Sequence, residues 1–464
     1  MISAKILCKG TFTFMTDNKL EELRQKINDV DDRILDLLAQ RAVVVSEIGK
    51  YKDTTNTVVD LDREQTILNR LLNKTKGEYS KDTIVRIWRE LFQASSKLQI
   101  SSDSLIQTKR SIDSIKIYKG GKSSVVGKSN FIKLSSNESS LGPSSSIAEI
   151  GNLKNITNSM HRYPEISGLT LRKEIAKLNN IDPHRIILGC GSDETLLFAA
   201  LSFCKDGDEI IQAEHGFEMY PIIAKIVGAT SKYAKEDSSY KVSIESICDQ
   251  VTEGTKLIYL ANPNNPTGTY LKRSEIAKLM QTLPKQVVLV LDGAYSEYVL
   301  EKDFDKGFSL TEEFENIILT RTFSKSYGLA GLRIGWCYAS SYVASILNKV
   351  KGPFNTTFIS QEMAIAALKD QDHIEKVVNT NIEVKTWFEN ELKQLKIQTR
   401  PSVANFSFVE TTHDQAEKIA NHLLENGILV RQLDSYNLPH CLRITIGTKT
   451  EMEMTINSLK KIIW

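Results

Sequence analysis

Apolar side chains near the start of the chain recur at the three- and four-residue steps of amphipathic helices. These steps recur from Leu20 to Ile48 and belong to one predicted helix of about 35 residues, roughly 50 Å long. Shorter stretches with the same three- and four-residue steps predict further helices over Asp60–Asn73 and Lys81–Gln99. A helix as long as the first cannot bury its apolar stripe alone. The pattern therefore predicts a three-helix unit that needs partner helices, often from a second chain.

After Ile115 the pattern changes to short β-branched runs that alternate with amphipathic stretches. The runs are Arg185–Leu188, Glu209–Gln212, Lys256–Leu260, Val287–Leu291 and Ile317–Leu319. Strands separated by helices predict a mainly parallel sheet with helices on both faces. Ligands of such sheets bind at the carboxyl ends of the strands.

A stretch rich in Ser, Lys and Asp, Ser101–Ser114, separates the two patterns. The predicted organisation is an N-terminal arm over 1–16, a helical unit over 17–100, a linker over 101–115 and an α/β unit over 116–464. Within the α/β unit, a large domain spans about 150–350, and a small domain combines the N-terminal segment with 355–464. Lys5 and Lys9 interrupt the apolar residues of the arm, which makes it a poor signal peptide and leaves both Met1 and Met15 open as the start.

The composition is that of an ordinary globular protein, with 41% hydrophobic and 25% charged residues over 464 positions. A net charge of +2 gives no broad electrostatic case for binding nucleic acid or an anionic membrane. No apolar run approaches the roughly 18 residues that a membrane helix needs. The six cysteines form no C-x-x-C pair, so we expect reduced thiols in a cytoplasmic protein without a metal site.

Two cations fall on the apolar stripe of the first predicted helix. The steps Ile34, Leu38, Arg41, Val45, Ile48 and Lys52 place Arg41 and Lys52 on its buried face. Buried cations must be paired, and this helix supplies no acid at the matching positions. An anionic ligand is one solution. Ser95 and Gln99, on the apolar stripe of Lys81–Gln99, also face inward.

Four segments of the helical unit resemble the all-helical chorismate mutase family, over Asp17 to about Ile100. They are Leu23–Asp31, Leu37–Arg41, Ile48–Lys52 and Asp60–Glu64. The resemblance implies an intertwined dimer in which Arg24 reaches into the partner's site. The substrate-binding residues that it implies are Arg24, Arg41, Lys52, Asp60, Arg63, Glu64, Ser95 and Gln99.

In that family chorismate rearranges to prephenate in one pericyclic step, which needs a folded substrate and stabilised charge on the breaking ether oxygen. By the resemblance, Arg24, Arg41 and Arg63 hold the two carboxylates. Lys52 and Gln99 donate to the ether oxygen, and Glu64 bonds a hydroxyl or, if protonated, that oxygen. A helical dimerisation arm, or a degenerate mutase kept as an allosteric sensor, remains the alternative.

Polar clusters follow the predicted strands of the α/β unit. Gly189–Glu194 opens a helix, where backbone N–H groups favour a phosphate. The compact turn Asn262–Gly268 can direct Asn265 into a site. Asp292 ends an apolar strand, where a buried carboxylate needs a cationic partner such as a protonated pyridinium nitrogen.

The stretch Thr322–Gly335 holds Lys325 between two serines, followed by glycine-spaced apolar residues and Arg333. A lysine amine that is kept partly neutral forms a Schiff base with an aldehyde such as pyridoxal phosphate. Thr322, Ser324 and Arg333 can then hold the phosphate.

These motifs, in this order and at these intervals, resemble the fold-type I aminotransferases that use pyridoxal 5′-phosphate, and within them the histidinol-phosphate aminotransferase group. The resemblance covers about Lys116 to Trp464. It implies a covalent bond between Lys325 and the cofactor. It also implies that Asp292 keeps the pyridine nitrogen protonated, and that Tyr295 and Asn265 bond the phenolate oxygen.

The other contacts implied by the resemblance are stacking by Phe217, a phosphate site, and Tyr163 from the other subunit. The phosphate site comprises Ser192, Asp193, Thr322, Ser324 and Arg333. Substrate contacts would come from Arg443, which clamps the α-carboxylate, from Asn137, and from Arg431, which can meet a phosphate or a second carboxylate. Leu141 would give the mouth of the site an apolar wall.

The sequence therefore predicts an all-α three-helix mutase module followed by an α/β fold-type I aminotransferase, in a homodimer. The predicted activities are formation of prephenate, and transamination of prephenate, phenylpyruvate or 4-hydroxyphenylpyruvate with glutamate in phenylalanine and tyrosine biosynthesis. Fusion of the two parts motivates this choice of acceptor. The alternative is histidinol-phosphate transamination, with the helical module acting as mutase or as a regulatory or dimerisation domain.

Overall fold

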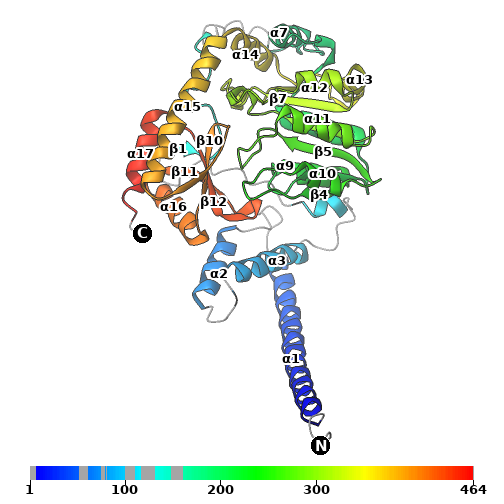
Figure 1. Ribbon diagram of the computed structural model, residues 1–464, viewed down its shortest axis with the longest axis vertical. Helices are drawn as coiled ribbons and strands as arrows, with labels where there is room; N and C mark the ends of the chain where they lie inside the picture. The colour runs from blue at the N-terminus through cyan, green and yellow to red at the C-terminus, as the bar shows by residue number, and fades with distance from the viewer. Residues whose placement is uncertain are drawn as a thin grey trace, which may run out of the picture. The chain divides into compact units, whose positions relative to one another are not determined.

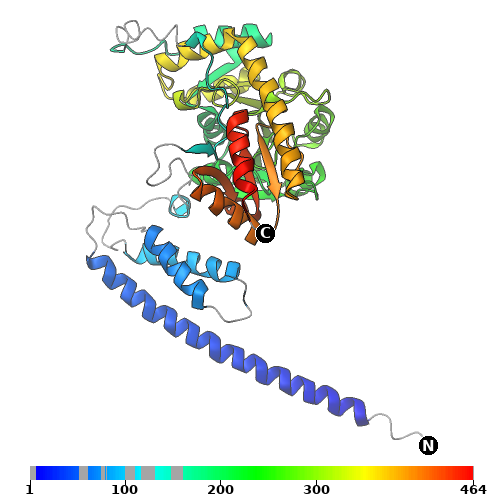
Figure 2. The ribbon, with the colours of Figure 1, turned by 90° about the vertical axis from the view of Figure 1, so that its left-hand side faces the viewer.

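The computed structural model describes residues 7–51, 61–74, 79, 81–99, 110–115, 131–147 and 160–462. The chain divides into two compact units, Met1–Thr108 and Lys109–Trp464 (Figures 1 and 2). Among the described residues, no helix combines the length and the apolar character needed to cross a membrane.

The first unit contains the three predicted helices, α1 (Leu7–Tyr51), α2 (Leu61–Lys74) and α3 (Lys81–Gln99). Figure 2 shows α1 as one long, unbroken helix. It begins at Leu7 rather than near Leu20, so residues 7–16 of the predicted N-terminal arm over 1–16 belong to this helix. Residues 7–19 contain one glycine and no proline, so they lack the residue that most strongly breaks a helix.

The apolar stripe of α1 is largely uncovered within one chain. Val45 is buried, together with Leu68 of α2 and Phe92 of α3. By contrast, Ile27 is 60% exposed and Ile34 is 49% exposed. Among the side chains of α1 that the structure describes, those of residues 19–48, only the ones toward the carboxyl-terminal end therefore contribute to the core that a single chain builds.

The larger part of the second unit, here the large lobe, is built on a seven-stranded sheet in the order β2-β8-β7-β6-β5-β3-β4. Its strands are β2 (Ile186–Gly189), β3 (Glu209–Ala213), β4 (Thr230–Ala234), β5 (Thr255–Ala261), β6 (Val288–Asp292), β7 (Ile317–Thr322) and β8 (Gly335–Ala339). Strand β8 runs opposite to the other six, so its pairings with β2 and β7 are antiparallel and the remaining pairings are parallel. All five predicted strands overlap strands of this sheet.

Helices cover both faces of this sheet. Alternate residues of its strands therefore belong to two separate cores. In β5, Ile258 and Leu260 belong to one core, and Leu257 and Tyr259 belong to the other. The helices are α7 (Leu169–Asn179), α8 (Ser192–Phe203), α9 (Met219–Val227), α10 (Ile244–Gln250), α11 (Arg273–Thr282), α12 (Phe308–Glu313), α13 (Ser341–Val350) and α14 (Phe358–Lys369). This is the doubly covered parallel sheet that the pattern predicted.

The remainder, here the small lobe, has a five-stranded sheet in the order β1-β11-β12-β10-β9 (Figure 1). Its strands are β1 (Ile132–Leu134), β9 (Gln398–Arg400), β10 (Phe406–Glu410), β11 (Ile428–Leu433) and β12 (Leu438–Thr445), with helices α15 (Gln371–Gln394), α16 (His413–Glu425) and α17 (Lys449–Leu459). Strand β1 pairs in parallel with β11. The segment that follows the linker therefore shares a sheet with the end of the chain.

Candidate active site

A cavity of about 310 Å³ lies where the strands β5, β6 and β7 end and the small lobe faces them. The predicted residues that line it are Asn137, Ser192, Asp193, Phe217, Asn265, Asp292, Tyr295, Thr322, Ser324, Lys325, Arg333, Arg431 and Arg443. Ser135, Ser136 and Tyr436 also line it and were not predicted. Tyr163 does not: it is 81% exposed, and its ring stacks on Phe354 at 4.5 Å.

Lys325 is buried beside the cavity, and its Nζ donates a hydrogen bond to the backbone carbonyl of Ser136 at 3.1 Å. Burial, and next the nearby Arg443 cation, lower the pKa of Lys325 to about 8. An amine with this pKa is partly neutral near neutral pH, which is the state that a nucleophile or a base requires.

Asp292 is the last residue of β6 and is 5% exposed. Its carboxylate accepts hydrogen bonds from the Tyr220 hydroxyl at 2.9 Å and from the Thr320 hydroxyl at 3.0 Å. Burial raises the pKa of Asp292, and these two hydrogen bonds oppose that rise. Asp292 makes no ion pair with any described residue, so the carboxylate lacks the cation that its burial calls for.

The sequence pattern did not point to Tyr220 or Thr320. Thr320 lies directly opposite Asp292 on the neighbouring strand β7, where a hydroxyl interrupts an apolar run. A threonine within this apolar run is the sequence feature from which a role for Thr320 could have been inferred. Tyr220 lies in the first turn of α9, and its approach to Asp292 depends on tertiary packing alone.

Residues that could hold an anion gather at the start of α8. The guanidinium of Arg333 donates to the Ser324 hydroxyl at 3.3 Å and to the Asp193 carboxylate at 3.1 Å, and Thr322 donates to Ser324 at 2.9 Å. Gly191 precedes the helix with φ 77°, and a Cβ there would lie 2.4 Å from Arg333 Nη2. The helix N-terminus, a guanidinium and hydroxyls thus converge as a phosphate site requires.

A second group of side chains faces Lys325 from the small lobe. Asn137 donates to the Tyr295 hydroxyl at 2.8 Å. Arg443 donates to the Asn265 side-chain oxygen and to the Ser135 carbonyl. Arg443 is 6% exposed, and its Nε has no hydrogen-bond partner, so this buried cation has capacity left for an anionic ligand.

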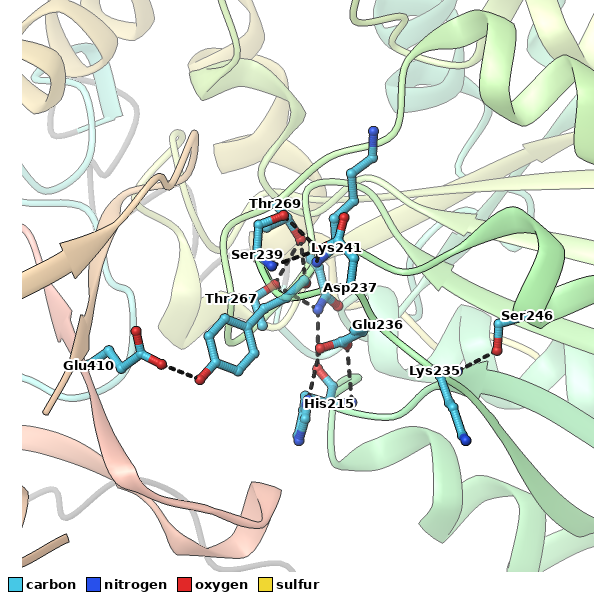
Figure 3. A network of polar contacts seen from close by, with 12 residues as sticks. His215, Lys235, Glu236, Asp237, Ser239, Lys241, Ser246, Thr267, Thr269 and Glu410 are labelled. Atoms are coloured by element: carbon cyan, nitrogen blue, oxygen red, sulfur yellow. Dashed lines mark hydrogen bonds and ion pairs between the residues drawn. The ribbon is translucent and has the colours of Figure 1, made fainter. Parts of the chain in front are cut away.

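The turn that carries Asn265 is held by a network of polar contacts (Figure 3). Asn264 donates to the Thr267 hydroxyl at 2.9 Å, and Thr267 lies 2.9 Å from the hydroxyl of Thr269. Thr269 donates to the backbone carbonyl of Tyr240, whose own hydroxyl donates to Glu410 of β10 at 2.6 Å. Polar contacts therefore run from this turn of the large lobe to a strand of the small lobe.

In the helical unit, the structure brings together two of the predicted residues. Arg41 of α1 donates to the hydroxyl of Ser95 on α3, and Ser95 is 7% exposed. The side chain of Arg24 is 63% exposed and pairs with Glu21 at 3.3 Å. Arg24 lies about 25 Å along the helix from Arg41 at roughly 1.5 Å per residue, so the two cannot share a site within one chain.

The other predicted mutase residues are placed only in part. Arg63 is exposed on α2. Glu64 and Gln99 lie on α2 and α3, but their side chains fall outside the described residues. Lys52 and Asp60 also lie outside the described residues.

Two family models match the chain. The model for aminotransferase class I and II matches residues 129–459, and the model for chorismate mutase type II matches residues 23–100. A histidinol-phosphate aminotransferase of Ruegeria pomeroyi is 41% identical over 347 residues, covering 75% of this chain and 95% of the relative. One from Pelagibacter ubique is 42% identical over 351 residues, covering 75% and 97%.

The second unit is also similar to solved structures. The histidinol-phosphate aminotransferase of Sinorhizobium meliloti, in complex with pyridoxal-5′-phosphate, has a TM-score of 0.71 at 24% identity, over 77% of this chain and 98% of that one. The one from Clostridium acetobutylicum has a TM-score of 0.65 at 20% identity, over 71% and 98%. These similarities and the two family matches confirm the predicted folds of both parts.

Proposed function

The chain belongs to the class I and II aminotransferases and carries a type II chorismate mutase domain, and from this premise we propose that it forms prephenate and transaminates an aromatic acceptor with glutamate. The observation that carries the aminotransferase half is a single cavity that holds Lys325, Asp292 and the anion site at the start of α8. The mutase half rests on the family match and on the contact between Arg41 and Ser95.

The cofactor of the aminotransferase half is pyridoxal 5′-phosphate, and the residues of the cavity fit it. Asp292, buried without a cation among the described residues, suits a protonated ring nitrogen. The N-terminus of α8, Arg333, Ser324 and Thr322 would hold the phosphate. When bound, this cofactor supplies an electron sink for the pair of electrons left on the substrate Cα.

The protein's own residues then position the substrate and move protons. Lys325, whose pKa is about 8, can take a proton from the substrate Cα as a base. Arg443 binds the α-carboxylate through its guanidinium, whose Nε has no hydrogen-bond partner in the described structure. Tyr295, Asn265 and Phe217 line the same cavity, where Tyr295 and Asn265 would bond the phenolate oxygen of the cofactor and Phe217 would contact its ring.

The mutase half needs positive charge and no proton transfer. Arg41, held by Ser95, would bind a substrate carboxylate, as would Arg63. Lys52 and Gln99 would donate to the ether oxygen. Arg24 can reach such a site only in a second subunit, because it lies too far along α1 from Arg41.

The amino acceptor is tested with a panel. The holoenzyme is supplied with glutamate and with phenylpyruvate, 4-hydroxyphenylpyruvate, prephenate or imidazole-acetol phosphate, and kcat/KM is measured for each. We expect the aromatic acceptors to be preferred, since the chain joins an aminotransferase to a domain that makes prephenate. Failure with all three aromatic acceptors would contradict the assignment to phenylalanine and tyrosine biosynthesis.

Histidinol-phosphate transamination is the second candidate. It is favoured by the relatives named histidinol-phosphate aminotransferase, which are about 40% identical over nearly their whole length. A preference for imidazole-acetol phosphate in the same panel would support it.

We also propose a homodimer. The apolar stripe of α1, with Ile27 60% exposed, provides a surface for partner helices, and Tyr163 is exposed where a second subunit could receive it. Sedimentation of the full chain should give about twice the chain mass of 52.2 kDa. A monomer at micromolar concentration would contradict the dimer.

The pKa of Lys325 predicts how cofactor loading depends on pH. Only the neutral amine attacks the cofactor aldehyde, and the pKa of about 8 means that protonation removes this form as the pH falls below 8. The rate at which the apoenzyme binds the cofactor covalently should therefore drop about tenfold per pH unit below 8 and level off above it. Stopped-flow absorbance measures this rate, and a midpoint near 10.5 would contradict the lowered pKa.

A further inference from the structure

A series of buried hydrogen bonds leads from Thr445 on β12 to the Tyr295 hydroxyl in the active-site cavity. The Asn137 backbone N–H donates to the Thr445 hydroxyl at 2.9 Å, and this hydroxyl donates to the Asn137 side-chain oxygen at 3.0 Å. The side-chain nitrogen of Asn137 then donates to the Tyr295 hydroxyl at 2.8 Å. Thr445, Asn137 and Tyr295 are 3%, 1% and 4% exposed, so these bonds are closed off from bulk water.

Thr445 determines which way round the Asn137 side-chain amide lies. In the described structure, the hydrogen of the Thr445 hydroxyl has no acceptor other than the Asn137 side-chain oxygen. If the amide turned over, its nitrogen would face Thr445 and this buried hydrogen would lose its acceptor, which is unfavourable in a site without water. The amide nitrogen, rather than the oxygen, is therefore directed at Tyr295.

The direction of this last bond decides what Tyr295 can offer a ligand. A hydroxyl that accepts a hydrogen bond from Asn137 keeps its own hydrogen for another partner. In the described structure the Tyr295 hydroxyl donates to no residue, and Tyr295 lines the cavity. Burial raises the pKa of Tyr295, and Arg443 and the bond from Asn137 oppose that rise without reversing it. The phenol therefore stays protonated near neutral pH, with its hydrogen available to an acceptor in the cavity.

We propose that Thr445 is a positioning residue: through Asn137, it keeps the Tyr295 hydroxyl as a hydrogen-bond donor toward the cavity. The inference rests on the proposed aminotransferase function, in which the acceptor is the ring oxygen of the cofactor. Without the Thr445 hydroxyl, the Asn137 amide can turn over, and its oxygen can accept the hydrogen of Tyr295. The cofactor would then lose this hydrogen bond although Tyr295 itself is unchanged.

The test compares the holoenzyme with Thr445→Val, which keeps the shape of the side chain and removes its hydroxyl. The measured quantity is the pH midpoint of the absorbance change of the covalently bound cofactor. A hydrogen bond to the ring oxygen withdraws negative charge that otherwise stabilises a proton on the nitrogen joining Lys325 to the cofactor. Loss of this bond should therefore raise the midpoint by about one pH unit. A midpoint that is unchanged or lower would overturn the proposal.

A double-variant comparison shows whether Thr445 acts through Tyr295. Tyr295→Phe removes the donated hydrogen directly and should raise the midpoint at least as much as Thr445→Val does. Adding Thr445→Val to Tyr295→Phe should then cause no further rise, because both substitutions remove the same bond. Shifts that add in the double variant would show that Thr445 acts by another route and would overturn the proposal.

Three further variants separate positioning from a general effect on the fold. Thr445→Ser keeps the hydroxyl and should restore the original midpoint. Thr455→Val removes a buried hydroxyl of α17, bonded to the Glu451 carbonyl at 2.8 Å, and should leave the midpoint unchanged. Should Thr445→Val fail to fold, Thr445→Ala removes the same hydroxyl with a smaller side chain, and the same rise is expected.

Thermal unfolding of the cofactor-free chain separates this proposal from the proposed function. The fall in Tm for Thr445→Val combined with Asn137→Ala should be smaller than the sum of the two single falls, because the two side chains share their hydrogen bonds. A chain that shows no absorbance of covalently bound cofactor would overturn the proposed function. Additive falls in Tm would instead overturn the role of Thr445, whether or not the cofactor binds.

Discussion

Replacing Lys325 with alanine should lower aminotransferase turnover on the order of 10⁴-fold or more, because one side chain supplies both the cofactor's covalent anchor and the base at the substrate Cα. Its surroundings cannot substitute for it, because no other residue that lines the cavity in the described structure carries an amine. Turnover with glutamate and an aromatic acceptor measures the loss. The absorbance of the protein after incubation with cofactor shows whether the covalent bond has been lost.

A matched control is Lys285→Ala, which removes an exposed lysine far from the cavity and should leave turnover unchanged. Chorismate turnover should also be unchanged in Lys325→Ala, because the helical unit is a separate compact unit. Aminotransferase turnover within tenfold of the unaltered chain would show that Lys325 is not the anchor.

Arg41→Ala should lower chorismate turnover on the order of 10³-fold while the helices remain folded. A guanidinium that binds a substrate carboxylate away from water is worth about 2–5 kcal/mol when it is removed, which corresponds to roughly 30- to 5000-fold. Ser95 would lose one hydrogen-bond partner but keep its bond to the Leu91 carbonyl. Disappearance of chorismate gives the rate, and far-UV circular dichroism gives the helix content.

Arg33→Ala is the control on the same helix. Arg33 is exposed, and it is not among the predicted substrate-binding residues of the mutase site. It should leave chorismate turnover within twofold. Unchanged turnover in Arg41→Ala would refute the mutase site and favour a helical module that only binds or dimerises. Aminotransferase turnover should be the same in both variants.

Residues at the ends of strands could be predicted because topology alone brings them together. Asn265, Asp292 and Lys325 each follow a predicted strand of one parallel sheet, and the structure places all three around one cavity. What was missed depends on packing between distant segments. Tyr220 reaches Asp292 across 72 positions, and Thr445 reaches Asn137 across 308, and no local pattern carries such information.

In the helical unit the stripe of apolar steps correctly placed Arg41 toward the interior, where it meets Ser95. The start of α1 was not predicted, because residues 7–19 show no regular apolar repeat that would indicate a helix. The roles of Lys52 and Asp60 stay predictions, since both lie outside the described residues.

Tyr240 adopts a left-handed backbone conformation, with φ 61°, that aromatic residues rarely occupy, and its hydroxyl is bonded to Glu410 in the small lobe. Its carbonyl is bonded to Thr269, and through Thr267 to the neighbour of Asn265. Tyr240 therefore links Glu410 of the small lobe to the turn that carries Asn265, through its hydroxyl on one side and its carbonyl on the other. Arg443 of the small lobe adds a direct bond to the Asn265 side-chain oxygen, so any movement between the two lobes would act on this turn through two side chains at once.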